Sequence, residues 1–189
     1  MRQITPTVKH LLIINCIIFA GTYLLGNKDF FYGLFALYYP FSDYFIPWQV
    51  FTHMFMHGGF PHLLFNMFAL FMFGTAVESV FGQRKFLIFY ISSGLGAVVL
   101  TFTVYYIQVY PIISDLQSIG FSFDFIKEVA RLDILSDRMF KGEILVSKLE
   151  PVLSSYGYTI SQMNGDSFRM LFDLIVISNG SMVGASGAI

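Results

Sequence analysis

The sequence predicts an all-α protein: a polytopic membrane helical bundle with three full spans, the start of a fourth, and a mostly helical polar insertion. Hydrophobic residues make up 56% of the 189 residues and charged residues only 12%, whereas a soluble domain carries about 25% charged residues. Three apolar runs in the first 110 residues approach the length of about 20 residues that a helix needs to cross a bilayer. Of the 11 basic and 12 acidic residues, 15 lie within residues 111–173.

The same composition excludes several classes of protein. High hydrophobicity is incompatible with a disordered chain. A net charge of −1 gives no electrostatic reason to expect nucleic acid as a partner. The single cysteine, Cys16, excludes an internal disulfide framework and a cysteine-built metal cage. We therefore expect the lipid bilayer as the main environment, with no cofactor and no metal.

The charge distribution divides the chain into three segments. Residues 1–110 are expected to form a membrane domain with spans 1–3 and the first loop. Residues 111–171 are expected to form a polar extracytoplasmic insertion. Residues 172–189 are expected to begin a fourth span that carries a serine motif.

Each of the three spans is a run with few or no charged residues. The first runs from Val8 to Leu25, the second from Phe60 to Phe81, and the third from Phe86 to about Ile107. The aromatic, Pro- and Gly-containing stretch between the first two spans, residues 30–59, suits a loop at the membrane interface. Residues 82–85 predict a tight basic turn before the third span.

Basic residues predict the orientation of the spans. Arg2 and Lys9 precede the first span, and Arg84 and Lys85 follow the second, so both positions fall on the same side of the membrane. The positive-inside rule makes that side the cytoplasm. The N-terminus is therefore expected inside, and the polar insertion outside.

The polar insertion is expected to be folded. Apolar residues recur at helical spacing, and Ser122 precedes them as a plausible helix cap; they are Phe125, Val129, Leu132, Leu135 and Met139. A second, shorter element is expected near Pro151. The simplest interpretation is a segment that packs on itself and on the membrane surface.

Polar residues cluster at the start of the second span in the pattern His53-x3-His57-x4-His62-x3-Asn66. Polar groups in hydrocarbon are costly and are functional candidates by default. His62 and Asn66 share one helix face, where they could cap the helix or contact its neighbours. A metal site built from the histidines is a third interpretation, but the nearest acidic residue, Glu78, is about 18 Å from Asn66 along the helix. We expect Glu78 to bond backbone or hydroxyl groups between helices.

The final residues contain Gly184-Ala185-Ser186-Gly187. Small residues of this kind can simply let helices pack closely. The alternative is a nucleophilic serine on a turn that enters a helix, where backbone N–H groups can bind an oxyanion. This motif alone leaves both interpretations open.

The histidine–asparagine run followed by the Gly-Ala-Ser-Gly motif resembles the rhomboid family of intramembrane serine proteases. Further marks of the family occur in the same order: Trp48, Gly74-x3-Glu78, Gly82, Phe86 and Gly94. The resemblance covers about residues 8–110 and 172–189. It implies a bundle of six helices with a water-filled cavity that opens to the outside of the membrane.

The resemblance also implies roles for individual residues. Ser186 would be the nucleophile, and its backbone N–H would stabilise the oxyanion together with His62 and Asn66. Gly184 and Gly187 would form the supporting loop. Substrates would be transmembrane proteins cleaved near the outer surface, and a bacterial cytoplasmic membrane would be the location.

The sequence departs from the family pattern in three places. Gln49 replaces the arginine of a Trp-Arg pair, about 60 residues are inserted after the third span, and the histidine that serves as general base is expected beyond Ile189. We therefore expect a truncated chain that is inactive as written. The alternative function is a non-catalytic relative that binds membrane-protein clients.

Overall fold

The computed structural model describes residues 3–132 and 141–184, and the chain forms two compact units. Unit 1 comprises Met1–Leu37, Ile46–Thr101 and Ser181–Ile189, and unit 2 comprises Tyr38–Phe45 and Phe102–Gly180. The domain boundaries expected at residues 110 and 171 stay a prediction.

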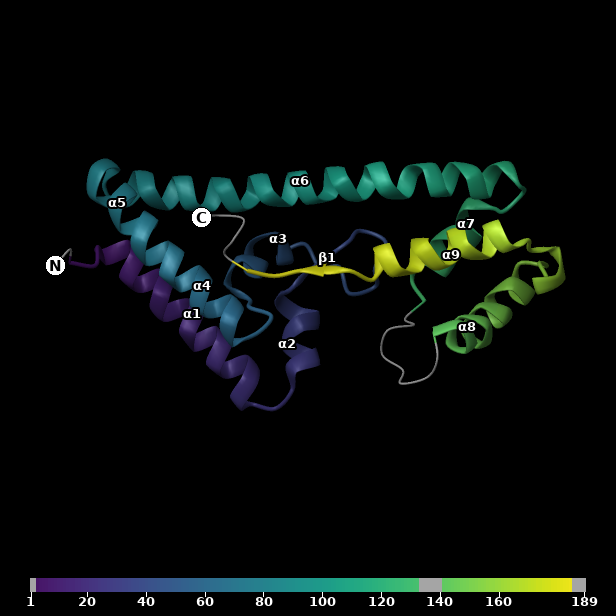
Figure 1. Ribbon diagram of the computed structural model, residues 1–189, viewed down its shortest axis with the longest axis horizontal. Helices are drawn as coiled ribbons and strands as arrows, with labels where there is room; N and C mark the ends of the chain where they lie inside the picture. The colour runs from purple at the N-terminus through teal and green to yellow at the C-terminus, as the bar shows by residue number, and fades with distance from the viewer. Residues whose placement is uncertain (1–2, 133–140, 185–189) are drawn as a thin grey trace. The chain divides into compact units, whose positions relative to one another are not determined.

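Unit 1 is helical (Figure 1). Its elements are α1 (Pro6–Leu24), α2 (Lys28–Phe35), α3 (Gln49–Thr52), a 3-10 turn (His53–Phe55), α4 (Phe60–Ala69), a π-helical turn (Leu70–Gly74), α5 (Thr75–Phe81) and the first half of α6 (Gln83–Ser118). The short strands β1 (Leu37–Tyr38) and β2 (Ser181–Met182) pair with each other.

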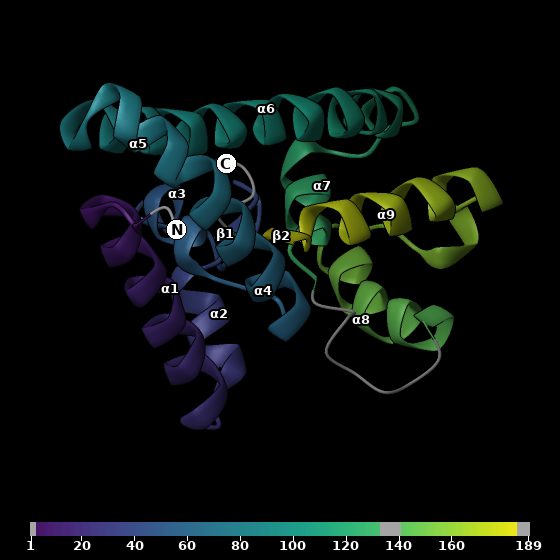
Figure 2. The same cartoon turned by 60° about the vertical axis from the view of Figure 1, so that its left-hand side comes forward.

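Three helical segments in the described part of the chain are long and apolar enough to cross a membrane: α1, Phe60–Phe81 and α6. The predicted fold class is thereby confirmed, and the chain is a multi-pass membrane protein. In the second span, α4 continues through the π-helical turn into α5, and α4 lies beside α1 (Figure 2). At Gly74, an added Cβ would lie 3.0 Å from Val8 and 3.2 Å from Phe86, so three helices meet closely at this glycine.

Glu78 joins α5 to the start of α1. Its carboxylate accepts hydrogen bonds from the Thr5 hydroxyl at 2.5 Å and from the backbone N–H groups of Thr7 and Val8 at 2.9 Å. The first turn of a helix has no internal partners for its N–H groups, and a carboxylate suits the positive end of the helix dipole. The predicted structural role of Glu78 is confirmed.

Helix α6 is longer than the sequence indicated. It continues past Ile107 to Ser118, through Pro111, and its 36 residues extend about 54 Å, whereas a bilayer core is about 30 Å thick. The helix continues because its second half contributes Tyr105, Val109 and Leu116 to the core of unit 2. The turn before α6 is shorter than the predicted four residues, 82–85. Gly82 alone forms it, at φ +81°, and α6 starts at Gln83.

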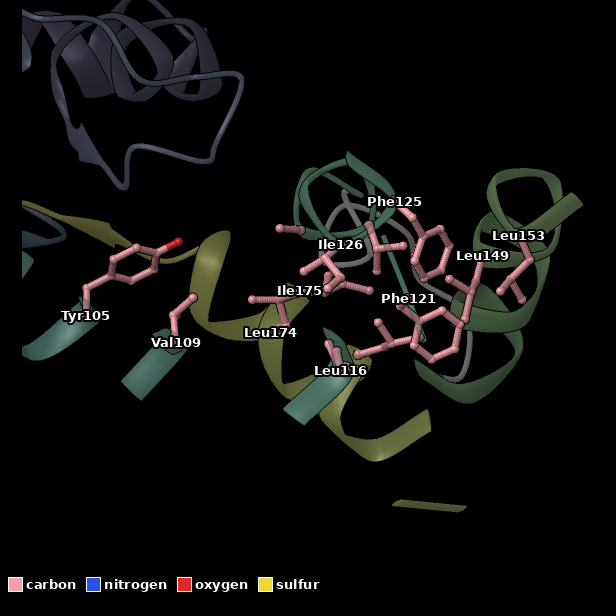
Figure 3. Close-up of a cluster of buried hydrophobic side chains, with 13 residues drawn as sticks. Tyr105, Val109, Leu116, Phe121, Phe125, Ile126, Leu149, Leu153, Leu174 and Ile175 are labelled. Atoms are coloured by element: carbon pink, nitrogen blue, oxygen red, sulfur yellow. The ribbon is translucent and has the colours of Figure 1, made fainter. Parts of the chain in front are cut away.

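Unit 2 contains the second half of α6, α7 (Phe123–Ala130), α8 (Lys141–Ser155), a 3-10 turn (Ile160–Gln162) and α9 (Gly165–Ser178). Figure 3 shows side chains from its helices meeting in one apolar cluster. Ser122 caps α7 by accepting a hydrogen bond from the N–H of Phe125, as predicted. The helix ends at Ala130, and the predicted helical positions Leu135 and Met139 lie outside the described residues. The element expected near Pro151 is α8.

Helix α9 leads to the serine motif. Asn164 caps its first turn, and Leu171, Leu174 and Ile175 are fully buried in the core of unit 2. The helix begins before residue 172, where the sequence placed the start of the fourth span, and it ends at Ser178. The assignment of residues 172–189 to a fourth span stays a prediction.

Candidate functional site

The start of α4 positions the polar pair His62 and Asn66. Gly59 precedes the helix and Pro61 occupies its first turn, where a proline needs no hydrogen-bond partner. One helical turn separates the two residues, so both face the same side, where Asn66 is buried and His62 half-buried. The face sharing predicted from the spacing is therefore present.

The segment that precedes Ser186 lies directly against this pair. A Cβ built on Gly184 would lie 2.7 Å from both Cε1 and Nε2 of His62 and 3.2 Å from Nδ2 of Asn66. Gly184 also has φ +114°, a conformation that strongly favours glycine. A larger residue would displace the His62 ring, so glycine is required here both for backbone conformation and for space.

A backbone hydrogen bond fixes the position of Gly184. Its N–H donates to the carbonyl oxygen of His53 at 2.9 Å, although 131 positions separate the two residues in the sequence. The His53 ring in turn places Nδ1 2.9 Å from the Gln49 carbonyl oxygen, so Nδ1 carries the proton. Burial lowers the pKa of His53, and the ring remains neutral at neutral pH.

The hydrogen bonding of His62 defines which of its nitrogens donates. The backbone N–H of Gly58 donates to Nδ1 of His62 at 3.3 Å. Because Nδ1 accepts, the proton of the neutral ring is on Nε2, which is the nitrogen facing Gly184. Among the described residues, the buried Nδ2 of Asn66 has no hydrogen-bond partner. Two N–H donors therefore converge on the backbone just before Ser186.

His57 is buried beside His62. It is 1% exposed, its ring packs edge-on against that of His62 at 5.3 Å between centroids, and neither ring nitrogen has a partner within the described part of the chain. Burial, and secondly the proximity of His62, lower the pKa of His57 to about 4. A neutral His57 is therefore part of the site at physiological pH.

Two tyrosines fix the loop that connects His57 to α4. The Tyr23 hydroxyl donates to the Gly58 carbonyl at 2.9 Å, and the Tyr32 hydroxyl donates to the His57 carbonyl at 3.2 Å. The ammonium of Lys28 lies 4.9 Å from the Tyr23 ring centroid and 5.5 Å from that of Tyr32. Helices α1 and α2 thus position the loop from two sides.

The first loop is closed by the side chain of Trp48, which precedes α3, and by two side chains of α3. The last carbonyls of a helix lack internal partners, and those of α2 at residues 33–35 accept from Gln49 at 2.8 Å, Trp48 at 2.9 Å and Thr52 at 3.0 Å. Gln49 also accepts from the N–H of Ile46 at 3.1 Å. The residue that departs from the Trp-Arg pair is therefore buried and bonded in this chain.

The described residues contain no group of three His, Cys, Asp or Glu side chains that could hold a metal ion. His53, His57 and His62 all fall within that part of the chain. Ser186 and Gly187 lie outside the described residues, and their roles, like those of the other site residues, stay predictions.

A protein-family model matches the part of the chain that contains this site. The rhomboid domain model matches residues 45–122, which include His53, His57, His62 and Asn66. This part of the chain is similar to rhomboid domains. It is 38% identical over 55 residues to rhomboid protease GluP of Bacillus subtilis (29% of the chain, 11% of the relative).

Two further relatives extend the comparison. The chain is 37% identical over 54 residues to RHOMBOID-like protein 6, mitochondrial, of Arabidopsis thaliana (29% of the chain, 18% of the relative). It is 30% identical over 98 residues to rhomboid protease GlpG of Salmonella choleraesuis (50% of the chain, 34% of the relative). The chain thus covers at most about a third of the length of these three relatives.

Sequence reasoning missed two features of this candidate site. The backbone contact between His53 and Gly184 carries no sequence signal, because any two residues can make it. The placement of His57 against His62 had a weak signal in the spacing of the histidines, which the loop conformation at Gly58 and Gly59 converts into a contact.

Proposed function

We propose that this chain belongs to an intramembrane serine endopeptidase that cleaves membrane proteins near the outer surface of the membrane. Ser186 is the nucleophile. His62 Nε2–H, Asn66 Nδ2–H and the backbone N–H of Ser186 stabilise the oxyanion. Gly184 and Gly187 shape the loop around the nucleophile.

The observation that supports this proposal is the convergence of the His62 and Asn66 donors on Gly184, two residues before Ser186. A buried amide N–H₂ without a partner is costly in a folded protein and is expected only where a ligand or water completes it. Donors that are already oriented stabilise a developing negative charge strongly in a site of low dielectric.

The chemistry follows from these donors. The Ser186 oxygen would attack the carbonyl carbon of the scissile peptide bond, and the carbonyl oxygen would become the oxyanion held by the donors. The serine proton passes to a base and then to the leaving amine, because an unassisted hydroxyl is a weak nucleophile. We assign none of the described histidines to that base.

The proposed partners follow from the environment of the site. The lipid bilayer surrounds the spans, and transmembrane proteins enter as substrates. The N-terminus lies inside and the site faces outward, consistent with the basic residues before α1 and after α5. A bacterial cytoplasmic membrane is the proposed location.

Reaction with a fluorophosphonate probe tests the proposal. The whole protein in proteoliposomes should be labelled and should cleave a transmembrane substrate, whereas Ser186→Ala should do neither. His62→Ala and Asn66→Ala should each lower kcat about 100-fold, the usual effect of removing one oxyanion donor. Stable binding of the substrate with no labelling or cleavage would instead identify a non-catalytic, client-binding relative.

A further inference from the structure

The His62 ring is bonded at Nδ1 by the peptide group that joins His57 to Gly58. The N–H of this peptide belongs to Gly58 and donates to Nδ1 at 3.3 Å. A Cβ added to Gly58 would lie 3.7 Å from the same nitrogen and 3.7 Å from the hydroxyl oxygen of Tyr32. The loop residue Gly58 therefore lies between the first turn of α4, which carries His62, and the side chain of Tyr32 on α2.

The carbonyl of the same peptide is bonded by α2. It belongs to His57 and accepts a hydrogen bond from the Tyr32 hydroxyl at 3.2 Å. A trans peptide is planar, and its C=O and N–H point in opposite directions. The peptide thus links two hydrogen bonds, one from the Tyr32 hydroxyl to the His57 carbonyl and one from the Gly58 N–H to His62. Because linked hydrogen bonds polarise one another, each strengthens the other.

The helix that carries Tyr32 is itself held in place. Asn27 caps the start of α2 by accepting a hydrogen bond from the N–H of Phe30 at 3.1 Å. The Lys28 ammonium, one helical turn before Tyr32, lies 5.5 Å from the Tyr32 ring centroid and 4.9 Å from that of Tyr23, within the range of a cation–π contact. With its last carbonyls bonded by the first loop, α2 is a fixed support for the Tyr32 hydroxyl.

The orientation of this peptide decides which form of neutral histidine is stable at position 62. A neutral ring carries its proton on one nitrogen and accepts at the other. The Gly58 N–H stabilises the form that accepts at Nδ1 and carries the proton on Nε2. A peptide turned over would present the His57 carbonyl to Nδ1 and favour the opposite form, in which Nε2 holds a lone pair that would repel an oxyanion.

From these contacts we infer that Tyr32 is a positioning residue: its hydroxyl orients the His57–Gly58 peptide, and that peptide keeps His62 in the Nε2–H form that an oxyanion donor needs. This inference rests on the proposed protease function. All the residues involved belong to unit 1. Helix α2 thereby acquires a part in the reaction besides closing the first loop.

Tyr23 provides a matched control. Its hydroxyl donates to the Gly58 carbonyl at 2.9 Å, which belongs to the next peptide, between Gly58 and Gly59. A phenylalanine at position 23 or 32 keeps the ring beside Lys28 and removes only the hydroxyl. Tyr23→Phe therefore removes a hydrogen bond from the same loop, whereas only Tyr32→Phe removes one from the peptide that bonds His62.

NMR of isotope-labelled histidine nitrogens tests the inference independently of activity. The whole protein is measured in detergent micelles at about pH 8, where an ordinary histidine is neutral, and His62→Gln identifies the His62 signals by their loss. In wild type and in Tyr23→Phe, Nε2 of His62 should carry the proton. In Tyr32→Phe, the signals should move to the opposite form or to an average of the two forms.

The His53 ring is an internal reference in the same spectra, because its Nδ1 is bonded to the Gln49 carbonyl and not to the His57–Gly58 peptide. Its signals should stay unchanged in Tyr32→Phe. Unchanged His62 signals in that variant would overturn the inference. An equal change in Tyr23→Phe, or a change that extends to His53, would also overturn it, since the hydroxyl would then support the loop as a whole.

Kinetics in proteoliposomes test the consequence for catalysis. Tyr32→Phe should lower kcat about tenfold, less than the roughly 100-fold expected from removing a donor outright, with KM within about twofold. Tyr23→Phe should keep kcat within about twofold. Altered His62 signals with an unchanged kcat would refute positioning. If wild type neither cleaves nor reacts with the probe, the protease function fails, while the NMR experiment still decides whether Tyr32 selects the form of His62.

Discussion

The two units bury different kinds of side chain. In the described part of unit 2, thirteen buried residues form one apolar cluster, contributed by four helices and the turn after α6, and charged residues lie elsewhere on those helices. Unit 1 has six residues in its buried apolar cluster, and many of its large apolar side chains are exposed, among them Ile17, Phe65 and Val80. Among the described residues, exposed large apolar side chains outnumber buried ones in unit 1 but not in unit 2.

Different forces hold the two units together. In water, burial of apolar surface drives folding. In lipid that force is absent between helices, and close packing at small residues and polar contacts between helices take its place. Unit 1 shows both devices, in Gly74, Gly94 and Glu78.

The largest effect is expected in the core of unit 2. Phe125 is fully buried and packs 5.0 Å from the Phe121 ring and 4.9 Å from the Tyr158 ring, between centroids. Phe125→Ala should lower the free energy of unfolding by about 3–5 kcal/mol, measured by denaturant titration in micelles. The matched variant Phe65→Ala, 71% exposed on α4, should change it by less than about 0.5 kcal/mol. Similar losses in both variants would contradict the comparison.

The next effect concerns the polar contact inside unit 1. Glu78 is 3% exposed, and Glu78→Leu leaves the Thr5 hydroxyl and two helix N–H groups without their acceptor. We expect a loss of about 3 kcal/mol in the free energy of unfolding. Glu78→Gln retains one acceptor oxygen and should lose less. Equal stability of the leucine variant and wild type would show that the contact contributes nothing.

Acid should destabilise unit 1 through its histidines. Because the folded-state pKa of His57 lies near 4, below the usual 6.5, the neutral ring favours folding. The contribution of neutral His57 to the free energy of unfolding is complete above pH 6.5. As the pH falls towards 4, up to about 3 kcal/mol of it is lost. His53, whose pKa is also lowered, adds in the same direction. Unfolding measured from pH 7.5 to 4 should show the loss, and His57→Phe should flatten it; an unchanged profile would exclude His57 as the source.

The smallest effect tests close packing of helices in unit 1. A Cβ on Gly94 would clash with the Sδ of buried Met54 at 2.6 Å, whereas a Cβ on Gly96, in the same helix, would meet nothing within 4 Å. Gly94→Ala should cost about 1–2 kcal/mol. Gly96→Ala should be neutral or stabilising by up to about 1 kcal/mol, because alanine favours helix. Thermal unfolding of both variants in the same detergent measures the difference, and opposite signs are the expected result.

Much of the fold could be predicted because its signals are local. Apolar runs placed the three spans within a few residues, apart from the far end of α6, and Ser122 marked the start of α7. The continuation of α6 through Pro111 could not be predicted, since it depends on Tyr105, Val109 and Leu116 packing against helices distant in sequence. The packing of α9 could not be predicted for the same reason. Its apolar residues Leu171, Leu174 and Ile175 fit a membrane span as well as they fit the core of unit 2.

At the site, helical spacing alone places His62 and Asn66 on one face, because the two residues lie one turn apart. The residues opposite them are set by contacts between distant parts of the chain. Gly184 reaches His62 and Asn66 through a hydrogen bond to His53, and Asn179 joins α9 to α7. The physical reason is that helical periodicity acts over about four residues, whereas these contacts join backbone carbonyls, which every residue carries, across 47 to 131 positions of sequence.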